Sequence, residues 1–300
     1  MLTRVPSYIG IFFLSIISLL PLSVLYLFAT IVYWAIFYIF KYRRKVVRTN
    51  LLNAFPEKSE TEINLIEKQF YKYLAALIFE IIKMASISQA ELQRRFTFKN
   101  IDLMNSHFER GQSVLVCSAH YGNWEWGTLA IGLLAKAQIN PIYKPLSNKV
   151  FDQWFLRIRS RFGNHMVSMR QTYRELSRTA NEITVFCFGN DQAPPYSEMQ
   201  VWRQFLNQQT SIQLGMEKIA IKTNRPVFYI KVSVIKKGYY EVDCVPLCLN
   251  PRQSTIEEIT ELHVRLLENI IREQPQYWLW SHKRWKHQPA ILLPSNVMQP

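Results

Sequence analysis

The feature that most constrains this chain is an apolar segment near its start, which carries no Asp, Glu, Lys or Arg from Tyr8 to Phe40. A helix needs about 20 apolar residues to cross a membrane. This segment is longer than that, and Pro21 interrupts it. It is also longer than the apolar part of a secretory signal peptide, and no small-residue cleavage site follows it. The pattern predicts a membrane anchor, built either as one kinked helix or as two short helices that dip into one leaflet.

A basic cluster follows the apolar segment directly. Four of the five residues Lys41–Lys45 are cations, and Arg48 comes soon after them. Lys and Arg beside a membrane segment accumulate on the cytoplasmic side. We therefore expect residues 1–48 to form the anchor with its basic flank, and residues 49–300 to form one domain on the cytoplasmic face.

The net charge of the chain limits the classes of partner that it is expected to bind. The sequence has 36 Lys and Arg against 22 Asp and Glu, a formal net charge of +14. Such a surface suits nucleic acid, anionic lipid headgroups or an acidic protein. The apolar anchor favours a membrane and argues against nucleic acid, because a nucleic-acid-binding protein has no evident need for it.

The cysteines point to neither a disulfide framework nor a metal centre. The four cysteines show no CxxC spacing, which suggests reduced thiols in a domain that faces the cytosol. Cys244 and Cys248 with His263 match no strong metal-site template. We expect no metal and no other cofactor.

Strand and helix patterns alternate after the anchor. Continuous apolar runs, typical of a sheet covered on both faces, predict strands at Val114–Ser118, Ile139–Tyr143, Ile183–Phe188, Val227–Val234 and Tyr239–Val245. Apolar residues spaced by three and four predict helices at Glu60–Met84, Trp126–Ala137, Lys149–Arg161, Ile212–Lys222 and Ile256–Arg272. No repeat or Pro/Gly-rich linker divides the chain, so the sequence predicts a single α/β domain.

A histidine lies at the end of the first predicted strand. His120 follows Val114–Ser118 closely, and Glu125 is five residues further on. Loops at strand ends carry binding sites because they are exposed while the strand stays rigid. Residues five apart lie about 140° apart around a helix. The two side chains can therefore meet if His120 precedes the helix and Gly122-Asn123 bends the chain back. The alternative is a structural histidine and a first-turn carboxylate stabilised by the helix dipole.

His120-x4-Glu125 behind a strand is similar to the HX4D/E motif of glycerolipid acyltransferases. The chain resembles in particular the lipid A biosynthesis acyltransferases, the Kdo-dependent lauroyl and myristoyl transferases of Gram-negative inner membranes. Further segments match that family in order: Tyr143-Lys-Pro145, Arg157–Gly163, Asn190-Asp-Gln192, Phe205, a helix start at Thr210-Ser211, and Pro275–Lys286. With the anchor, these segments cover nearly the whole chain.

Three positions depart from the family pattern. Lys144 stands where the family has arginine, Asn190 where it has proline, and Trp285 where it has phenylalanine. None of these changes removes an acid or a base. The expected reaction is therefore unchanged, and the identity of the acceptor stays open.

The resemblance implies a glycerolipid-acyltransferase-like domain with a mixed sheet flanked by helices, on the cytoplasmic face of the inner (plasma) membrane. It implies acyl carrier protein as the donor, since that small acidic protein suits a basic surface, and a lipid A-type precursor as the lipid acceptor. Acyl-CoA is the alternative donor. A lysophospholipid, a glycolipid or an aminoacyl lipid is the alternative acceptor, because the motif does not distinguish O- from N-acylation. In a different class, a non-enzymatic basic membrane-associated binding protein would not need His120 or Glu125.

The chemistry of acyl transfer assigns roles to the two motif residues. A neutral imidazole suits the removal of a proton from an attacking hydroxyl, so His120 is the expected general base. Glu125 is expected to accept a hydrogen bond from the other ring nitrogen, which would fix the tautomer and stabilise the imidazolium. No Gly-x-Ser-x-Gly elbow is present, and none is required.

The remaining candidate residues would bind substrate or the oxyanion. Arg159, with Arg157 and Arg161 as alternatives, is expected to hold the oxyanion or an acceptor phosphate. Asp191 either serves the site or only begins a turn before Pro194-Pro195. Tyr143, Asn123 and Gln192 complete the expected set.

The aromatic residues of the C-terminal block have two interpretations. Tyr277, Trp278, Trp280 and Trp285 stand beside Lys283, Arg284 and Lys286. They form a membrane-interface belt, core packing with a solvated tail, or some of each, and we expect some of each.

Overall fold

The computed structural model describes residues 4–196, 199 and 201–289. Its N-terminal part is two helices, α1 (Val5–Leu19) and α2 (Leu22–Trp34), and a π-helical segment continues α2 over Ala35–Ile39. The break lies at Pro21, because a proline disfavours the helical conformation in the residue before it. Leu20 is accordingly extended, with φ −63° and ψ 148°. The apolar segment is thus two helices rather than one kinked helix.

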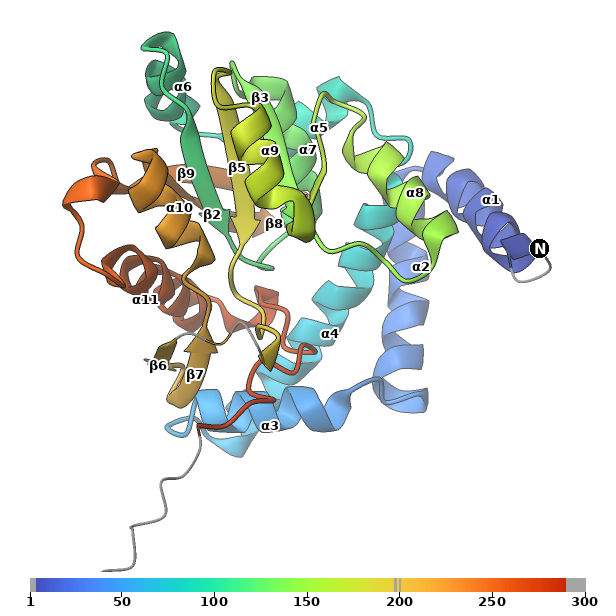
Figure 1. Cartoon of the computed structure of the whole chain (residues 1–300). Helices are drawn as coiled ribbons and strands as arrows, with labels where there is room; N and C mark the ends of the chain where they lie inside the picture. Colours follow the sequence, from blue (N-terminus) through green and yellow to red (C-terminus); the bar gives the residue numbers. More distant parts are fainter. Residues whose placement is uncertain (1–3, 197–198, 200, 290–300) are drawn as a thin grey trace, which may run out of the picture.

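Both N-terminal helices pack on the domain with one face only. The Lys83 ammonium, at the end of α4 (Glu60–Lys83), donates to the carbonyl oxygens of Ser18 and Leu20 at 3.0 and 3.1 Å and so caps α1. In Figure 1, α1 and α2 lie on the side of the molecule away from α6 (Ile101–Glu109) and α11 (Glu258–Glu273). Their outer faces expose large apolar side chains such as Phe12 and Ile31. Among the described residues, Leu22–Ile39 is long and apolar enough to cross a membrane.

The centre of the domain is a seven-stranded sheet in the order β1-β9-β8-β2-β5-β3-β4. Its strands are β1 (Phe96–Phe98), β2 (Val114–Ser118), β3 (Gln138–Tyr143), β4 (Val167–Ser168), β5 (Thr184–Gly189), β8 (Val227–Lys236) and β9 (Tyr239–Cys248). All neighbours are parallel except β8 and β9. The mixed sheet is as expected, and each of the five predicted strands is confirmed.

Helices flank this sheet (Figure 1). Besides those already named, they are α3 (Arg44–Ala54), α5 (Gln89–Arg95), α7 (Trp124–Leu134), α8 (Lys149–Arg159), α9 (Thr172–Arg178) and α10 (Gly215–Thr223). A small antiparallel hairpin of β6 (Val201–Phe205) and β7 (Gln208–Ile212) lies outside the large sheet. The helix start expected at Thr210-Ser211 is wrong, because both residues belong to β7 and the helix begins at Gly215.

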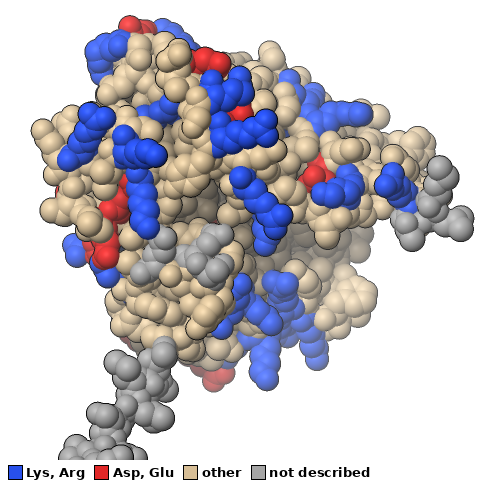
Figure 2. Space-filling model, viewed as in Figure 1, with Lys and Arg blue, Asp and Glu red and all other residues tan. Residues whose placement is uncertain are grey.

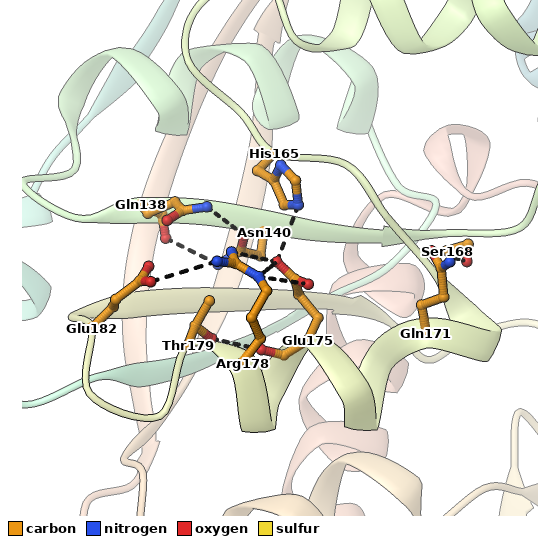
Figure 3. Close-up of polar contacts among 9 residues, drawn as sticks. All are labelled: Gln138, Asn140, His165, Ser168, Gln171, Glu175, Arg178, Thr179 and Glu182. Carbon is orange, nitrogen blue, oxygen red and sulfur yellow. Dashed lines mark hydrogen bonds and ion pairs between the residues drawn. The ribbon is translucent and has the colours of Figure 1, made fainter.

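A cluster of polar side chains attaches α9 to the edge of the sheet (Figure 3). The Glu175 carboxylate accepts from Nε and Nη2 of Arg178, and it lies 3.1 Å from Nε2 of His165. Arg178 is about half exposed. Exposed ion pairs contribute roughly 0–1 kcal/mol each, so this cluster orients α9 more than it stabilises the fold.

Candidate active site

The site is built on two neighbouring parallel strands. β2 and β5 pair in register from Val114 with Val185 to Ser118 with Gly189. Because the two strands are parallel, their carboxyl ends lie side by side. His120 follows β2 and Asp191 follows β5, so the two residues meet there. His120 Nδ1 lies 2.7 Å from Asp191 Oδ1, and the backbone N–H of His120 donates to Asp191 Oδ2 at 3.0 Å.

Asp191 is a buried carboxylate that accepts a third hydrogen bond. The indole Nε1–H of Trp278 donates to Asp191 Oδ2 at 2.9 Å, and Asp191 is only 5% exposed. Burial by itself would raise the pKa of Asp191. The charge of His120 and the hydrogen bonds from His120 and Trp278 outweigh burial and hold that pKa below its usual range. Asp191 is therefore an anion that fixes the histidine ring.

The second ring nitrogen of His120 faces the open side of the site. Because the Asp191 carboxylate accepts from Nδ1–H, Nε2 carries the lone pair in the neutral ring, and the Gln192 amide nitrogen lies 3.1 Å from it. The edge of the ring contacts Trp124, with centroids 5.0 Å apart. Burial opposes protonation of His120, but Asp191 and the more distant Glu125 outweigh it and raise the pKa of His120. The side chain is 25% exposed, so a substrate can reach Nε2.

The hydrogen bond expected between His120 and Glu125 is wrong. The chain does bend after His120, since Gly122 has φ +57°. However, α7 begins at Trp124, and Glu125 in its first turn points to α8. There Arg159 donates Nε to Glu125 Oε2 at 2.7 Å and Nη2 to Glu125 Oε1. The ring of His120 is oriented by Asp191 instead.

The same ion pair occupies part of Arg159, which the sequence predicts to hold the oxyanion or an acceptor phosphate. Two of its N–H groups are bound by Glu125, so an oxyanion or a phosphate would have to compete with a buried carboxylate. Burial tends to lower the pKa of Arg159, and Glu125 outweighs it and raises that pKa. Arg159 is therefore a positively charged partner of Glu125 near the site.

The other expected residues divide into two groups. Gln192 contacts His120, and Tyr143 stands half-buried at the end of β3. Asn123 is fully buried and does not face the site. It caps α7 by accepting from the Trp126 N–H at 2.9 Å, and it donates to Glu80 at 2.7 Å. Asn123 therefore positions the loop that follows His120.

The C-terminal block packs against the loop that follows β2 and carries His120. Tyr121 pairs with Trp278 in a β-bridge, and the Gly122 N–H donates to the Tyr277 carbonyl at 3.1 Å. Trp278 and Trp280 are 2% and 0% exposed, so these two residues belong to the core and not to a membrane-interface belt. The family-like ending of the sequence signalled that this block matters, but no pattern in it indicated a bond to Asp191.

Glu80 is a further buried carboxylate, and the sequence did not identify it. Its oxygens accept from Tyr26 Oη at 2.7 Å, Asn123 Nδ2 at 2.7 Å and Tyr240 Oη at 2.6 Å. Burial raises the pKa of Glu80, and the three donors oppose that rise only in part. This carboxylate joins α2, α4, β9 and the cap of α7. Nothing in the sequence distinguishes Glu80 from the other acids of α4.

Within the described parts of the chain, no three His, Cys, Asp or Glu side chains converge as metal ligands. The arrangement is an oriented imidazole with a free nitrogen at the edge of a sheet, beside a buried Glu–Arg pair. It is suited to remove a proton from a substrate.

Two comparisons with known proteins agree with this chemistry. The family described as bacterial lipid A biosynthesis acyltransferase matches residues 1–287. A lipid A biosynthesis acyltransferase of Haemophilus influenzae is 26% identical over 281 residues, which cover 91% of this chain and 85% of that protein. The chain therefore belongs to the bacterial lipid A biosynthesis acyltransferases and is an enzyme that transfers acyl groups.

Proposed function

We propose that this enzyme moves a fatty acyl chain from acyl carrier protein to a hydroxyl group of a lipid A precursor, with His120 as the general base. The single observation that carries the proposal is the bond between His120 Nδ1 and Asp191, which leaves Nε2 unprotonated at the exposed side of the site. An imidazole held in this way can accept a proton at the moment of attack.

The reaction runs in two proton transfers. As the acceptor hydroxyl attacks the thioester carbonyl, its proton passes to Nε2 of His120, and Asp191 stabilises the imidazolium. The C–S bond of the tetrahedral intermediate then breaks, and the imidazolium returns the proton to the leaving thiolate. Base catalysis of this kind contributes about 10²–10⁴ in rate.

Glu125 and Arg159 act on this reaction from a distance. Glu125 raises the pKa of His120, and so its charge favours the imidazolium that forms during attack. Arg159 holds Glu125 in place through two parallel bonds, a geometry that lysine does not reproduce. We therefore propose that Glu125 stabilises the imidazolium of His120 through its charge, and that Arg159 positions Glu125.

The surface supports the proposed donor and the proposed location. Figure 2 shows a face of the molecule on which Lys and Arg are spread widely and acidic side chains are few, in keeping with the net charge of +14. Such a face attracts a small acidic carrier protein. The exposed apolar faces of α1 and α2 suit attachment of residues 1–48 to the inner membrane. The basic flank of this segment would lie on the cytoplasmic side. Residues 49–300 would then also face the cytoplasm, where they would meet both substrates.

The proposal is tested by transfer of a labelled acyl group in membranes that contain the protein. Acyl carrier protein and CoA thioesters serve as donors. A tetra-acylated Kdo-lipid A precursor, a lysophospholipid and an aminoacyl lipid serve as acceptors. We expect transfer from the carrier protein to the lipid A precursor, and a loss of at least about 100-fold in His120→Ala.

His165→Ala is the matched control, because it removes a histidine from the Glu175 cluster at the far edge of the sheet. It should keep normal activity. Transfer only to another acceptor would keep the chemistry and change the substrate. Near-normal turnover in His120→Ala would overturn the assigned base.

A further inference from the structure

A groove of about 360 Å³ lies along α2, on a part of the molecule that the acyl-transfer chemistry does not use. It is lined by Ala29, Thr30, Tyr33, Trp34, Lys72 and Lys237. Tyr26, Ala29 and Tyr33 are spaced by three and four and therefore share one face of the helix. Ala29 and Tyr33 line the groove, and the Tyr26 ring lies next to its Lys237 end. We call this groove with its lining the α2 groove.

A lysine lies over the aromatic ring at each end of the groove. The Lys72 ammonium, from α4, is 5.7 Å from the centroid of the Tyr33 ring. The Lys237 ammonium, from the turn between β8 and β9, is 4.2 Å from the centroid of the Tyr26 ring. Tyr26 and Tyr33 are seven residues apart, about 10 Å along a helix axis. Two cations from separate elements thus flank one groove.

Neither cation is neutralised by the protein. The ion pairs found among the described residues include neither Lys72 nor Lys237. The charge of Glu80 acts on Lys237, but the Glu80 carboxylate is already bound by three neutral donors. Lys237 is exposed, and its partial burial lowers the pKa of its ammonium while the charge of Glu80 opposes that change. An anion in the groove would supply a counter-ion.

The fold holds Lys237 in this place. Gly238 has φ +71°, a conformation that favours glycine. A Cβ atom at this position would collide with the Tyr26 hydroxyl. The Arg95 guanidinium also donates to the Gly238 carbonyl at 3.4 Å. The backbone of the β8–β9 turn is therefore fixed against α2, and the exposed Lys237 side chain lines the groove from this turn.

The surface next to the groove indicates what kind of anion binds. Leu27, Ile31 and Trp34 form a stripe along α2 and are 67%, 65% and 54% exposed. An apolar stripe with a tryptophan at its edge is typical of a helix at the membrane interface, where cations contact lipid phosphates. The charged side chains of α4 run alongside α2, and burying them in the hydrocarbon layer would be costly. This edge of α2 therefore belongs at the level of the headgroups.

We propose that the α2 groove binds the phosphate headgroup of an anionic membrane phospholipid between Lys72 and Lys237, with the acyl chains along the stripe of Leu27, Ile31 and Trp34. The proposal rests on the membrane attachment given above but not on the acyl-transfer chemistry. In this arrangement α2 lies in the membrane surface, and its rotation about the helix axis is fixed relative to the membrane. The bound lipid fixes the depth at which the domain sits.

The test uses the full chain purified in a neutral detergent. Thermal unfolding is followed while dioctanoyl phosphatidylglycerol, dioctanoyl phosphatidylcholine or inorganic phosphate is added. We expect phosphatidylglycerol to raise Tm in a saturable way, and the other two to have little effect at the same concentration. Native mass spectrometry of the same samples counts the lipid molecules that stay bound.

The decisive variant is the double change Lys72→Ser and Lys237→Ser, which should lose the Tm shift and the bound lipid. The matched control is Lys218→Ser and Lys222→Ser, two exposed lysines of α10 far from α2, which should keep both. If the double variant does not fold, each single Ser change is measured instead and should weaken lipid binding at least about tenfold.

An unchanged shift in the variants would overturn the proposal. So would an equal shift with inorganic phosphate, which would indicate a general anion site. His120→Ala should keep the lipid shift, so that failure of this site and failure of the catalytic proposal remain distinguishable.

Discussion

Asp191 and Glu80 are both buried carboxylates that accept three hydrogen bonds, yet their pKa values move in opposite directions. At Asp191 two of the bonds come from His120, whose ring can carry a positive charge, and the third comes from Trp278. At Glu80 all three donors are neutral. The pKa of Asp191 is lowered and that of Glu80 is raised, although burial pushes both upward.

The comparison shows that burial alone does not decide what an acid does. A carboxylate beside a group that can become a cation stays charged and can stabilise that cation during a reaction. A carboxylate among hydroxyl and amide donors only ties elements together. The first belongs to the candidate site, and the second to the frame that holds the loop after His120.

The largest effect should come from Asp191→Asn, which removes the charge and keeps the size. Without the anion, the imidazolium of His120 is no longer stabilised, and the ring can adopt the wrong tautomer. We expect kcat to fall about 10³-fold. The measurement is turnover with saturating donor, accompanied by Tm to show that the protein is folded. Retention of more than a tenth of the wild-type kcat would break the distinction between the two acids.

Breaking the Glu125–Arg159 pair should have a smaller effect. Arg159→Lys keeps the charge but loses the parallel bonds to Glu125. We expect Arg159→Lys to lower kcat about tenfold and Glu125→Gln to lower it about 10–100-fold. Both effects are limited because Glu125 and Arg159 act on His120 only through their charges. Arg157→Lys on the same helix is the control and should change little. An effect of Glu125→Gln as large as that of Asp191→Asn would mean that Glu125 contacts the reacting groups directly.

The pH dependence of activity should report the raised pKa of His120. Only the unprotonated ring can accept a proton, so kcat/KM should rise about tenfold per pH unit until the pH passes the pKa of His120 in the free enzyme. Glu125→Gln removes one cause of the raised pKa and should move the midpoint to lower pH. A midpoint unchanged by Glu125→Gln would argue against an electrostatic role for that residue.

The two acids should also differ in how they couple stability to pH. The pKa of Asp191 is lower in the folded state, so its contribution to the free energy of unfolding is present above the usual Asp range and is lost as pH falls. The pKa of Glu80 is higher in the folded state, so its contribution is present at low pH and is lost as pH rises through that raised pKa. Denaturant unfolding of Glu80→Gln at several pH values should show the variant gaining on the wild type as pH rises. The opposite trend would show that Glu80 is charged in the fold.

The smallest effect should come from removing one donor of Glu80. Tyr240→Phe deletes a single hydrogen bond to a buried acid, which costs about 1–3 kcal/mol in the free energy of unfolding. Because the bond is remote from the reacting atoms, kcat should stay within about twofold. Denaturant unfolding and turnover of the same sample measure both. A tenfold loss of kcat with unchanged stability would place the Glu80 cluster in the catalytic machinery.

The sequence predicted the fold better than it predicted the partners within the site. Long apolar strands such as β2 and β8 are visible because their composition differs from that of the chain around them. The short strand β7 is polar and precedes an apolar helix, so its Thr210 and Ser211 were taken as the helix start. The basic helix α3 was missed because its charges dominate its pattern.

Within the site, His120 was identified from its place at a strand end. Its hydrogen-bond partner was assigned to Glu125, which is near in sequence, whereas Asp191 lies 71 residues away. That contact forms because β5 is the neighbour of β2 in the sheet. The segments around His120 and Asp191 do not reveal which strands are neighbours. The Trp278 bond to Asp191 depends in the same way on where the C-terminal block folds back.

That fold-back has a consequence for how the enzyme is made. Synthesis produces α1 and α2 first, and it produces Trp278 only after every strand of the sheet. With the membrane attachment proposed above, a growing chain can therefore reach the membrane while Asp191 still lacks one of its three donors and the Tyr121–Trp278 bridge is absent. Attachment would precede activity, so the acyltransferase would begin to work only where its substrates are found.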